Sequence, residues 1–233
     1  MRVVISAGGT GGHIYPALAI INKIKEMEPN SEFLYIGTTN RMEKDLIPSM
    51  GYRYEGIEVT GFKRKLTLDN FKTITNFINA IKRCKIIIKD FDPDIVIGCG
   101  GYVTAPVIYA AKKLGKKTFI HEQNSVVGLA NKFLARYTDK IGVSFESTIK
   151  DFPKGKAVLT GNPCSEKALN IKKTTKEKLD IAKDKKLVLI VMGSLGSRTI
   201  NDKIFSFIDK FRSKNYSVII VTGNSYYERV KDK

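Results

Sequence analysis

The chain has 233 residues, of which 42% are hydrophobic, 19 are glycine and 7 are proline, and its formal net charge is +17. This composition is that of an ordinary globular protein, and it excludes collagen-like, low-complexity and disordered chains. The basic excess predicts attraction to an acidic partner, such as nucleic acid, an anionic membrane surface or a phosphorylated substrate.

The cysteines and the apolar runs indicate the compartment. Three widely spaced cysteines form neither a disulfide framework nor a zinc-binding pattern, so we expect a reducing compartment. The N-terminus reaches a glycine run after a short apolar stretch and lacks a signal-peptide layout. No stretch approaches the roughly 18 uninterrupted apolar residues of a membrane span. We therefore expect a soluble, cytoplasmic protein that meets a membrane only from its surface.

Short apolar runs alternate with segments of helical spacing over the first part of the chain. Strands that alternate with helices predict an α/β fold with a parallel sheet covered on both faces and right-handed crossovers. The strands are expected at 2–7, 33–37, 94–98 and 117–121, and the helices at 16–27, 45–50, 70–89 and 106–114.

The pattern changes after Pro163. Residues 166–186 are lysine-rich and weakly apolar, which is typical of a surface connection. A strand at 187–192, a helix at 200–211 and a strand at 217–223 then make one βαβ unit, fewer strands than an α/β domain usually has. We expect two domains, residues 1–162 and residues 163–233, and we expect the second to be incomplete.

Three of the expected strands run directly into glycine clusters, at 8–12, 98–101 and 193–196. Ligands of open α/β sheets bind at the carboxyl ends of strands, and glycine lets backbone amides approach a phosphate closely. One such loop is as readily a structural turn, but three at equivalent positions favour a phosphate-bearing ligand. Because none matches G-x-x-x-x-G-K-[ST] or G-x-G-x-x-G, a P-loop NTPase and a standard dinucleotide-binding domain are excluded.

Both histidines lie where expected strands end. His13 closes the first glycine cluster, where an imidazole beside phosphate-binding amides can act as a base or stabilise charge. His121 begins the segment HEQN and is equally well a packed residue. Glu122 is an alternative base, or a carboxylate that orders the loop by accepting backbone N–H bonds. Asn124 either contacts a sugar or phosphate or forms an Asx-turn.

Two further charged groups have alternative interpretations. Asp90, Asp92 and Asp94 lie at the amino end of a strand, away from the glycine loops, so a solvated turn is favoured and no metal or cofactor is expected. Residues 61–89 combine an apolar stripe with many basic residues, which is typical of a half-buried helix or, alternatively, of a membrane-surface patch. No RNA or DNA signature accompanies the charge, so no nucleic acid is expected as a partner.

Six segments in chain order carry a resemblance to a known family. They are AGGTGGHIYPALAI (7–20), IGTTNRMEKDLIP (36–48), GCGGYVTAP (98–106), HEQNSVVGLANKFLA (121–135), TGNP (160–163) and GSLGSRTIND (193–202). Together they resemble the MurG family, the N-acetylglucosaminyltransferases of bacterial peptidoglycan synthesis. The combination of the first, second and fourth segments is highly specific.

The resemblance implies a GT-B glycosyltransferase at the cytoplasmic face of the cell membrane, with a Rossmann-like acceptor-binding domain (1–162) and part of a second, UDP-sugar-binding domain (163–233). Such an enzyme transfers N-acetylglucosamine from UDP-N-acetylglucosamine, with inversion, to the C4 hydroxyl of undecaprenyl-diphospho-N-acetylmuramoyl-pentapeptide. The segment 61–89 falls where the family is thought to dock on an anionic membrane. Because the family's second domain is longer, we expect the 233-residue chain alone to be inactive.

Two alternatives to this transferase stay open. In the first, the chain as given is a non-catalytic module that binds a lipid diphosphate or a membrane. In the second, it belongs to a related sugar-nucleotide glycosyltransferase.

The resemblance also assigns roles to single residues. It matches His13 to a candidate catalytic base or electrostatic stabiliser, and Glu122 is the second candidate base, with the choice between the two left open. The positions that match the family's donor contacts, for UDP-N-acetylglucosamine, are Thr10, Gly11, Gly12, Asn124 and Ser194. The positions that match the loop facing the acceptor diphosphate are Gly100, Gly101 and Tyr102.

Overall fold

The computed structural model divides the chain into two compact units, Met1–Asn170 and Ile171–Lys233, and each is considered by itself. The structure describes residues 1–61, 69–169, 171–191, 203, 206–211, 213–223, 226–228 and 231, with the side chains of 69–72 left out.

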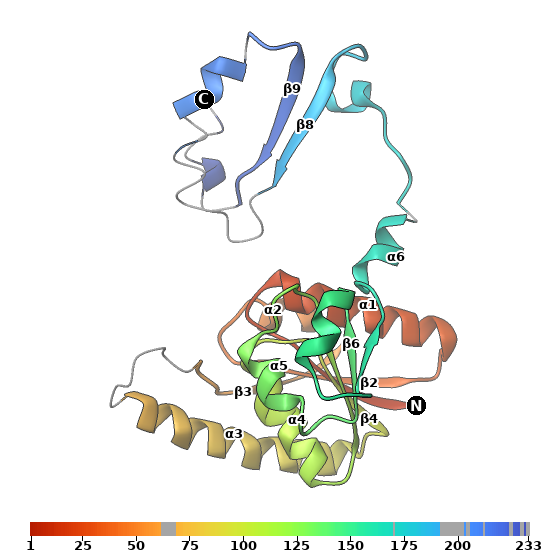
Figure 1. The fold of residues 1–233 in the computed structure, drawn as a ribbon, viewed down its shortest axis with the longest axis vertical. Helices are drawn as coiled ribbons and strands as arrows, with labels where there is room; N and C mark the ends of the chain where they lie inside the picture. Colours follow the sequence, from red (N-terminus) through yellow and green to blue (C-terminus); the bar gives the residue numbers. More distant parts are fainter. Residues whose placement is uncertain are drawn as a thin grey trace. The chain divides into compact units, whose positions relative to one another are not determined.

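The first unit is built on a seven-stranded sheet in which all neighbouring strands are parallel (Figure 1). The strand order is β3-β2-β1-β4-β5-β6-β7, so the direction of progression reverses between β1 and β4. This is the order of a Rossmann-like sheet, whose ligands bind outside the carboxyl ends of the strands at that reversal. The strands are β1 (Arg2–Ser6), β2 (Glu32–Thr38), β3 (Arg53–Ile57), β4 (Ile95–Gly98), β5 (Lys117–Glu122), β6 (Lys140–Val143) and β7 (Ala157–Leu159).

Helices cover both faces of this sheet, and a hydrophobic cluster fills each side (Figure 1). Alternate residues of β1 point to opposite faces, so Val3 and Ile5 lie in one cluster and Val4 lies in the other. The Val3 cluster includes buried residues of α1 and α2, and the Val4 cluster includes buried residues of α3, α4 and α5. The helices are α1 (Gly11–Met27), α2 (Glu43–Ser49), α3 (Asp69–Phe91), α4 (Thr104–Lys113), α5 (Leu129–Leu134) and α6 (Cys164–Leu169), with a 3₁₀ turn η1 (Glu146–Asp151).

The α/β fold class predicted from the sequence is confirmed, and one helix boundary differs in a way that matters for the site. The helix expected at 16–27 begins at Gly11, so the glycine cluster forms its first turn and Pro16 lies inside it. α6 contacts α1, where the Lys23 ammonium lies 2.7 Å from a Glu166 carboxylate oxygen. The first unit therefore includes α6, whereas the expected first domain ended at residue 162.

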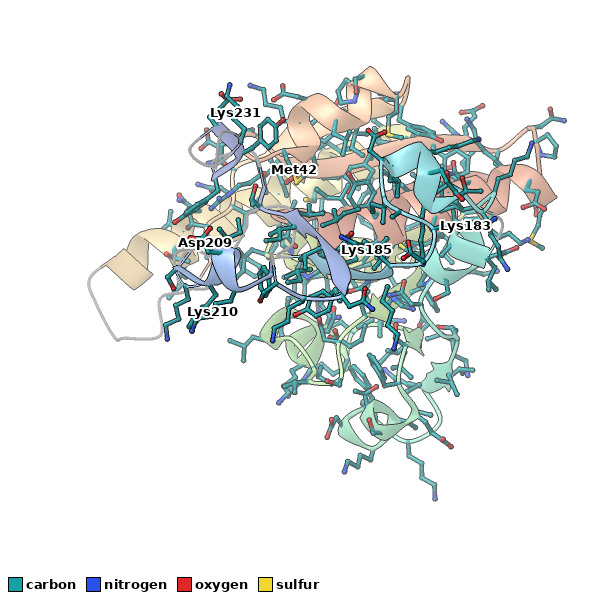
Figure 2. All side chains as sticks on the ribbon, turned by 90° about the horizontal axis from the view of Figure 1, so that it is seen from above. Met42, Lys183, Lys185, Asp209, Lys210 and Lys231 are labelled. Carbon is teal, nitrogen blue, oxygen red and sulfur yellow. The ribbon has the colours of Figure 1, made fainter. Side chains whose placement is uncertain are left out.

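The second unit contains a parallel pair of strands, β8 (Lys186–Val191) and β9 (Tyr216–Val221), preceded by a 3₁₀ turn η2 (Lys176–Leu179). Lys186 is paired with Tyr216 and Val191 with Val221. Exposed lysines, among them Lys183, Lys185 and Lys210, project from this unit (Figure 2).

No helix in the described ranges is long and apolar enough to cross a membrane. No group of three or more His, Cys, Asp or Glu side chains in those ranges is placed to hold a metal ion.

Candidate functional site: two glycine loops at the reversal of strand order

The loops after β1 and β4 contact each other where the strand order reverses. The Gly8 N–H donates to the Gly100 carbonyl oxygen (N···O 3.2 Å), and the Thr104 hydroxyl donates to the same oxygen (2.8 Å). Gly100 and Gly101 have φ values of +100° and +88°, a region that disfavours side chains. A Cβ at Gly101 would also overlap the Gly8 carbonyl oxygen. The close approach of the two loops therefore depends on glycine.

His13 lies between the two loops. Its Nδ1 is 3.1 Å from the Gly8 carbonyl oxygen, which can only accept, so the neutral ring carries its proton on Nδ1 and leaves Nε2 as an acceptor. A Cβ built on Gly100 would lie 2.6 Å from His13 Cδ2 and 3.1 Å from Nε2. The basic nitrogen of the half-buried ring thus borders the second loop. This arrangement can accept a proton from a hydroxyl bound between the loops.

The start of α1 can bind an anion. The N–H groups of His13 and Ile14 donate to the Thr10 carbonyl oxygen, so the helix begins immediately after Thr10. The first amides of a helix, here those of Gly11 and Gly12, have no intrahelical acceptor, and the helix dipole adds partial positive charge. No acidic residue occurs in this first turn. These features are those of a phosphate-binding helix N-terminus.

Glu122 ends β5 and is 1% exposed. One carboxylate oxygen accepts from the Asn124 N–H (3.0 Å) and from the Asn124 amide Nδ2 (2.8 Å). The other accepts from the Gly128 N–H (3.0 Å) and from Asn131 Nδ2 (2.9 Å). A buried carboxylate whose two oxygens each accept two bonds is suited to order the loop, which is the second of the two interpretations open from the sequence.

His121 is 1% exposed and points toward the segment that follows β7. Its Nε2 is 3.0 Å from the Gly161 carbonyl oxygen and 3.2 Å from the Thr160 hydroxyl. Burial lowers the pKa of His121 below its ordinary value because the charged imidazolium is poorly solvated there. The geometry is that of a packed, neutral histidine that joins β5 to the end of β7.

The loop after β5 approaches the second glycine loop. The Gln123 side-chain amide donates to the Cys99 carbonyl oxygen (3.0 Å), and β5 pairs with β4 along the sheet. Glu122 and Asn124 therefore belong to the same edge of the sheet as His13 and the two glycine loops. Ser194, the remaining expected donor contact, lies outside the described residues.

Tyr102 leads from the second glycine loop to an apolar cavity of about 420 Å³. Tyr102 is 63% exposed, and Ile74 and Ile78 on α3 are also about half exposed. The cavity is lined by Val59, Thr60, Phe77, Tyr102, Ala105, Leu129, Ala130 and Phe133.

Sequence reasoning did not single out Glu43 or Gln123. Glu43 is fully buried and accepts from the Gly9 N–H (3.2 Å). Both residues lie inside segments that carry the family resemblance, 36–48 and 121–135, which was the signal available. Their contacts with Gly9 and Cys99 could not be assigned without the fold, because these residues lie 34 and 24 positions away in sequence.

A parallel sheet of this order, with glycine loops and a helix N-terminus at the reversal, defines a Rossmann-like domain that binds phosphate-bearing ligands. The glycosyltransferase family 28 N-terminal domain matches residues 3–143. The chain therefore belongs to glycosyltransferase family 28, and its fold is of the GT-B type.

Similar proteins extend the match over the whole chain. The chain is 48% identical over 233 residues to the UDP-N-acetylglucosamine–N-acetylmuramyl-(pentapeptide) pyrophosphoryl-undecaprenol N-acetylglucosamine transferase of Bacillus cytotoxicus, and 46% identical to that of Listeria welshimeri. All of the chain is covered, and it spans 64% of the length of each of these relatives.

Solved structures show the same fold. The crystal structure of Acinetobacter baumannii MurG matches 99% of the chain with a TM-score of 0.70 and 25% identity, and 63% of that structure is covered. A UDP-GlcNAc 2-epimerase from Neisseria meningitidis, solved with UDP-GlcNAc bound, matches with a TM-score of 0.62 and 17% identity. It covers all of this chain, and 69% of its own length is matched. At that identity the second match shows the fold alone.

Proposed function

We propose that the whole protein transfers N-acetylglucosamine from UDP-N-acetylglucosamine to the C4 hydroxyl of undecaprenyl-diphospho-N-acetylmuramoyl-pentapeptide, with inversion of the anomeric centre. The names of the relatives support this reaction, since both are transferases of N-acetylglucosamine to that kind of acceptor. The observation that carries the proposal is the position of His13, held between two glycine loops at the reversal of strand order. A base beside anion-binding amides is what the reaction requires.

In this proposal, His13 Nε2 accepts the proton of the attacking C4 hydroxyl as the new glycosidic bond forms and UDP leaves. The Nδ1 contact to the Gly8 carbonyl oxygen fixes the ring orientation and stabilises the imidazolium produced. The leaving diphosphate takes the electron pair of the broken bond, and preorganised amides can hold its charge at no reorganisation cost.

We assign the acceptor diphosphate to the second loop and the donor sugar to the first. Gly100 and Gly101 allow backbone to approach a phosphate closely, and Tyr102 borders that loop. Thr10, Gly11 and Gly12 form the start of α1, where a donor group can meet the helix amides.

Asn124 and Ser194 are proposed as further donor contacts. Asn124 is exposed at the surface of the loop that Glu122 orders, which supports a binding role. The assignment of 1–162 to the acceptor and of 163–233 to the donor follows from the same proposal.

We propose a second partner, the anionic surface of a membrane, which the acceptor's lipid requires in any case. Ile74 and Ile78 are exposed apolar side chains on α3, beside the cavity that Phe77 lines. The net charge of +17 would attract anionic headgroups. These features support a peripheral location on a membrane, and we propose that it is the cytoplasmic face.

The module that binds a lipid diphosphate without turnover remains the alternative for the chain as given. The observation in its favour is that the chain spans 64% of its relatives' length. The 233-residue chain alone is expected to bind the acceptor without transferring sugar in both cases, so they are separated by an assay of the whole protein, which transfers sugar only in the first.

The test of the proposed reaction is transfer of labelled N-acetylglucosamine to a short-chain, soluble acceptor by the whole protein and its His13→Gln variant. Loss of a general base lowers kcat by about 10² to 10⁴, so we expect a fall in that range with little change in either KM. A kcat within about threefold of wild type would remove His13 from the base position.

Glu122→Gln separates the two carboxylate interpretations in the same assay. The glutamine side chain of this variant must turn its NH₂ group toward N–H groups that already donate to Glu122. If Glu122 orders the loop, the free energy of unfolding should therefore fall by about 1–3 kcal/mol. A variant of unchanged stability whose kcat drops as far as that of His13→Gln would instead identify Glu122 as the base.

A further inference from the structure

Glu43 is a buried carboxylate that touches the first glycine loop, although it begins a different helix, α2. It is 0% exposed. One of its oxygens accepts from the Gly9 N–H (3.2 Å), and the other accepts from the Thr38 N–H (3.2 Å) and the Thr38 hydroxyl (2.6 Å). Glu43 therefore joins the loop after β1 to the end of β2.

Two glycines make room for this side chain. A Cβ at Gly8 would overlap a Glu43 carboxylate oxygen, and a Cβ at Gly37 would lie 2.8 Å from Glu43 Cγ. Neither glycine has a φ in the left-handed region, so space, and not backbone conformation, requires glycine there. The site around the carboxylate is thus built by three separate segments of the chain.

The burial of this group is expensive without compensation. Within the described part of the chain, no Lys, Arg or His nitrogen forms an ion pair with Glu43. Its three donors are neutral, and burying a carboxylate without a cationic partner is unfavourable unless hydrogen bonds offset the lost solvation. Burial raises the pKa of Tyr35 and of Tyr54, and the negative charge of Glu43 raises both further.

We propose that Glu43 is a positioning residue for the first glycine loop. The carboxylate holds the Gly9 N–H, which fixes the peptide between Gly8 and Gly9. The carbonyl of that same peptide is the Gly8 oxygen that contacts His13 Nδ1. One peptide unit therefore carries the restraint from Glu43 to the imidazole.

The contact from Glu43 also limits which backbone amides can bind a phosphate. Because Glu43 occupies the Gly9 amide, that amide is not among those that hold a phosphate, and the amides at the start of α1 are left for this purpose. The effect of Glu43 on catalysis through His13 rests on the proposed function of His13, whereas the restraint of the loop by Glu43 does not.

The test uses Glu43→Gln, with Asp45→Asn as the matched control. Asp45 is an exposed carboxylate on the same helix. An amide has only one oxygen, so in Glu43→Gln its NH₂ group must face either the Gly9 N–H or the Thr38 N–H, both of which are donors. The oxygen that faces Thr38 accepts two bonds and the oxygen that faces Gly9 accepts one, so we expect the amide to keep its oxygen at Thr38 and to lose the bond to Gly9. Asp45→Asn should change neither contact.

The first readout is amide hydrogen exchange and the ¹H–¹⁵N spectrum of the 233-residue chain. In Glu43→Gln we expect the Gly9 amide to shift and to exchange at least about tenfold faster, with core strand amides less affected. An unchanged Gly9 amide would overturn the inference, whatever reaction the protein performs. If Glu43→Gln does not fold, Glu43→Asp, one methylene shorter, is judged by the same readout.

The second readout is the kinetics of the whole protein. Displacement of a base costs about 10- to 100-fold in rate, so we expect kcat to fall in that range while the KM values stay within about threefold. A freed Gly9 amide with unchanged kcat would overturn the positioning role. If the wild-type protein transfers no sugar, the proposed function fails, and the exchange experiment still decides whether Glu43 holds the loop.

Discussion

At the scale of single residues, the glycines of the second loop differ from other left-handed glycines in what surrounds them. Gly101 has φ +88° and faces the Gly8 carbonyl oxygen, whereas Gly115 has φ +73° with nothing within 4 Å of an added Cβ. The two positions share the conformational requirement, and only Gly101 adds a steric one. The contact between the two loops can therefore be measured as the additional loss of stability when Gly101 is replaced by alanine.

Alanine substitution separates these two contributions. Gly115→Ala should cost about 1 kcal/mol of unfolding free energy, the ordinary penalty of a left-handed alanine. Gly101→Ala should cost at least about 1–3 kcal/mol more, because the backbone must move away from Gly8. Urea unfolding of both variants measures the difference. Equal losses would show that the two loops do not press against each other as described.

The candidate site could be predicted in part at this scale. The glycine clusters and His13 were identifiable because glycine runs after apolar strands have a local signature. The distinction between a base and a loop-ordering carboxylate at Glu122 was not accessible, since it depends on Asn131 and Gly128 folding back onto it. Glu43 was missed for the same reason: its partner Gly9 is 34 positions away.

At the scale of elements, the strands β1, β2, β4 and β5 were predicted, and β3, β6 and β7 were not. β1, β2, β4 and β5 have nearly continuous buried residues, which leaves a clear signal in the sequence. β3 is half-buried, and β7 has three residues, two of them exposed. Such short edge strands are specified by pairing with a neighbour, which a single sequence does not display.

His121 links two of these elements, and its burial predicts a pH dependence of stability. The folded-state pKa is lowered below the ordinary value of 6.5, so the unfolded chain takes up the proton first as the pH falls. The stability contributed by neutral His121 is present above about pH 6.5 and is lost as the pH falls below it.

Urea unfolding at about pH 7.5, 6.5 and 5.5 measures this loss. In His121→Gln the decrease between the two ends of that window should be smaller than in the wild-type chain. His13→Gln is the matched control for the removal of a histidine, because His13 takes no part in the contacts of His121 with Thr160 and Gly161. A decrease of the same size in His121→Gln and the wild-type chain would contradict the assignment.

At the scale of the whole molecule, the charge of +17 and the exposed apolar side chains of α3 point to the same kind of partner. Basic charge alone gives salt-sensitive attraction to any polyanion. Exposed isoleucines add a contribution that salt does not screen and that a lipid surface can satisfy. The two contributions can be separated because they lie on different residues.

Sedimentation with vesicles tests the membrane proposal. We expect the chain to bind vesicles that contain phosphatidylglycerol, and Ile74→Glu combined with Ile78→Glu to weaken that binding by about tenfold or more. Ile86→Glu is the control, since Ile86 is 61% exposed on the same helix but on a different side of it. Equal weakening by both changes would indicate charge repulsion without a specific apolar contact.

The most direct test of the central claim is a calorimetric titration of the chain with a short-chain, soluble analogue of the diphosphate-linked muramoyl pentapeptide, at two salt concentrations and with excess DNA as competitor. The two glycine loops at the strand reversal predict saturable binding that survives the higher salt and the DNA. They also predict that Gly101→Ala weakens this binding while Gly115→Ala does not. Binding that disappears with salt, or that ignores the sugar of the acceptor, would contradict the claim.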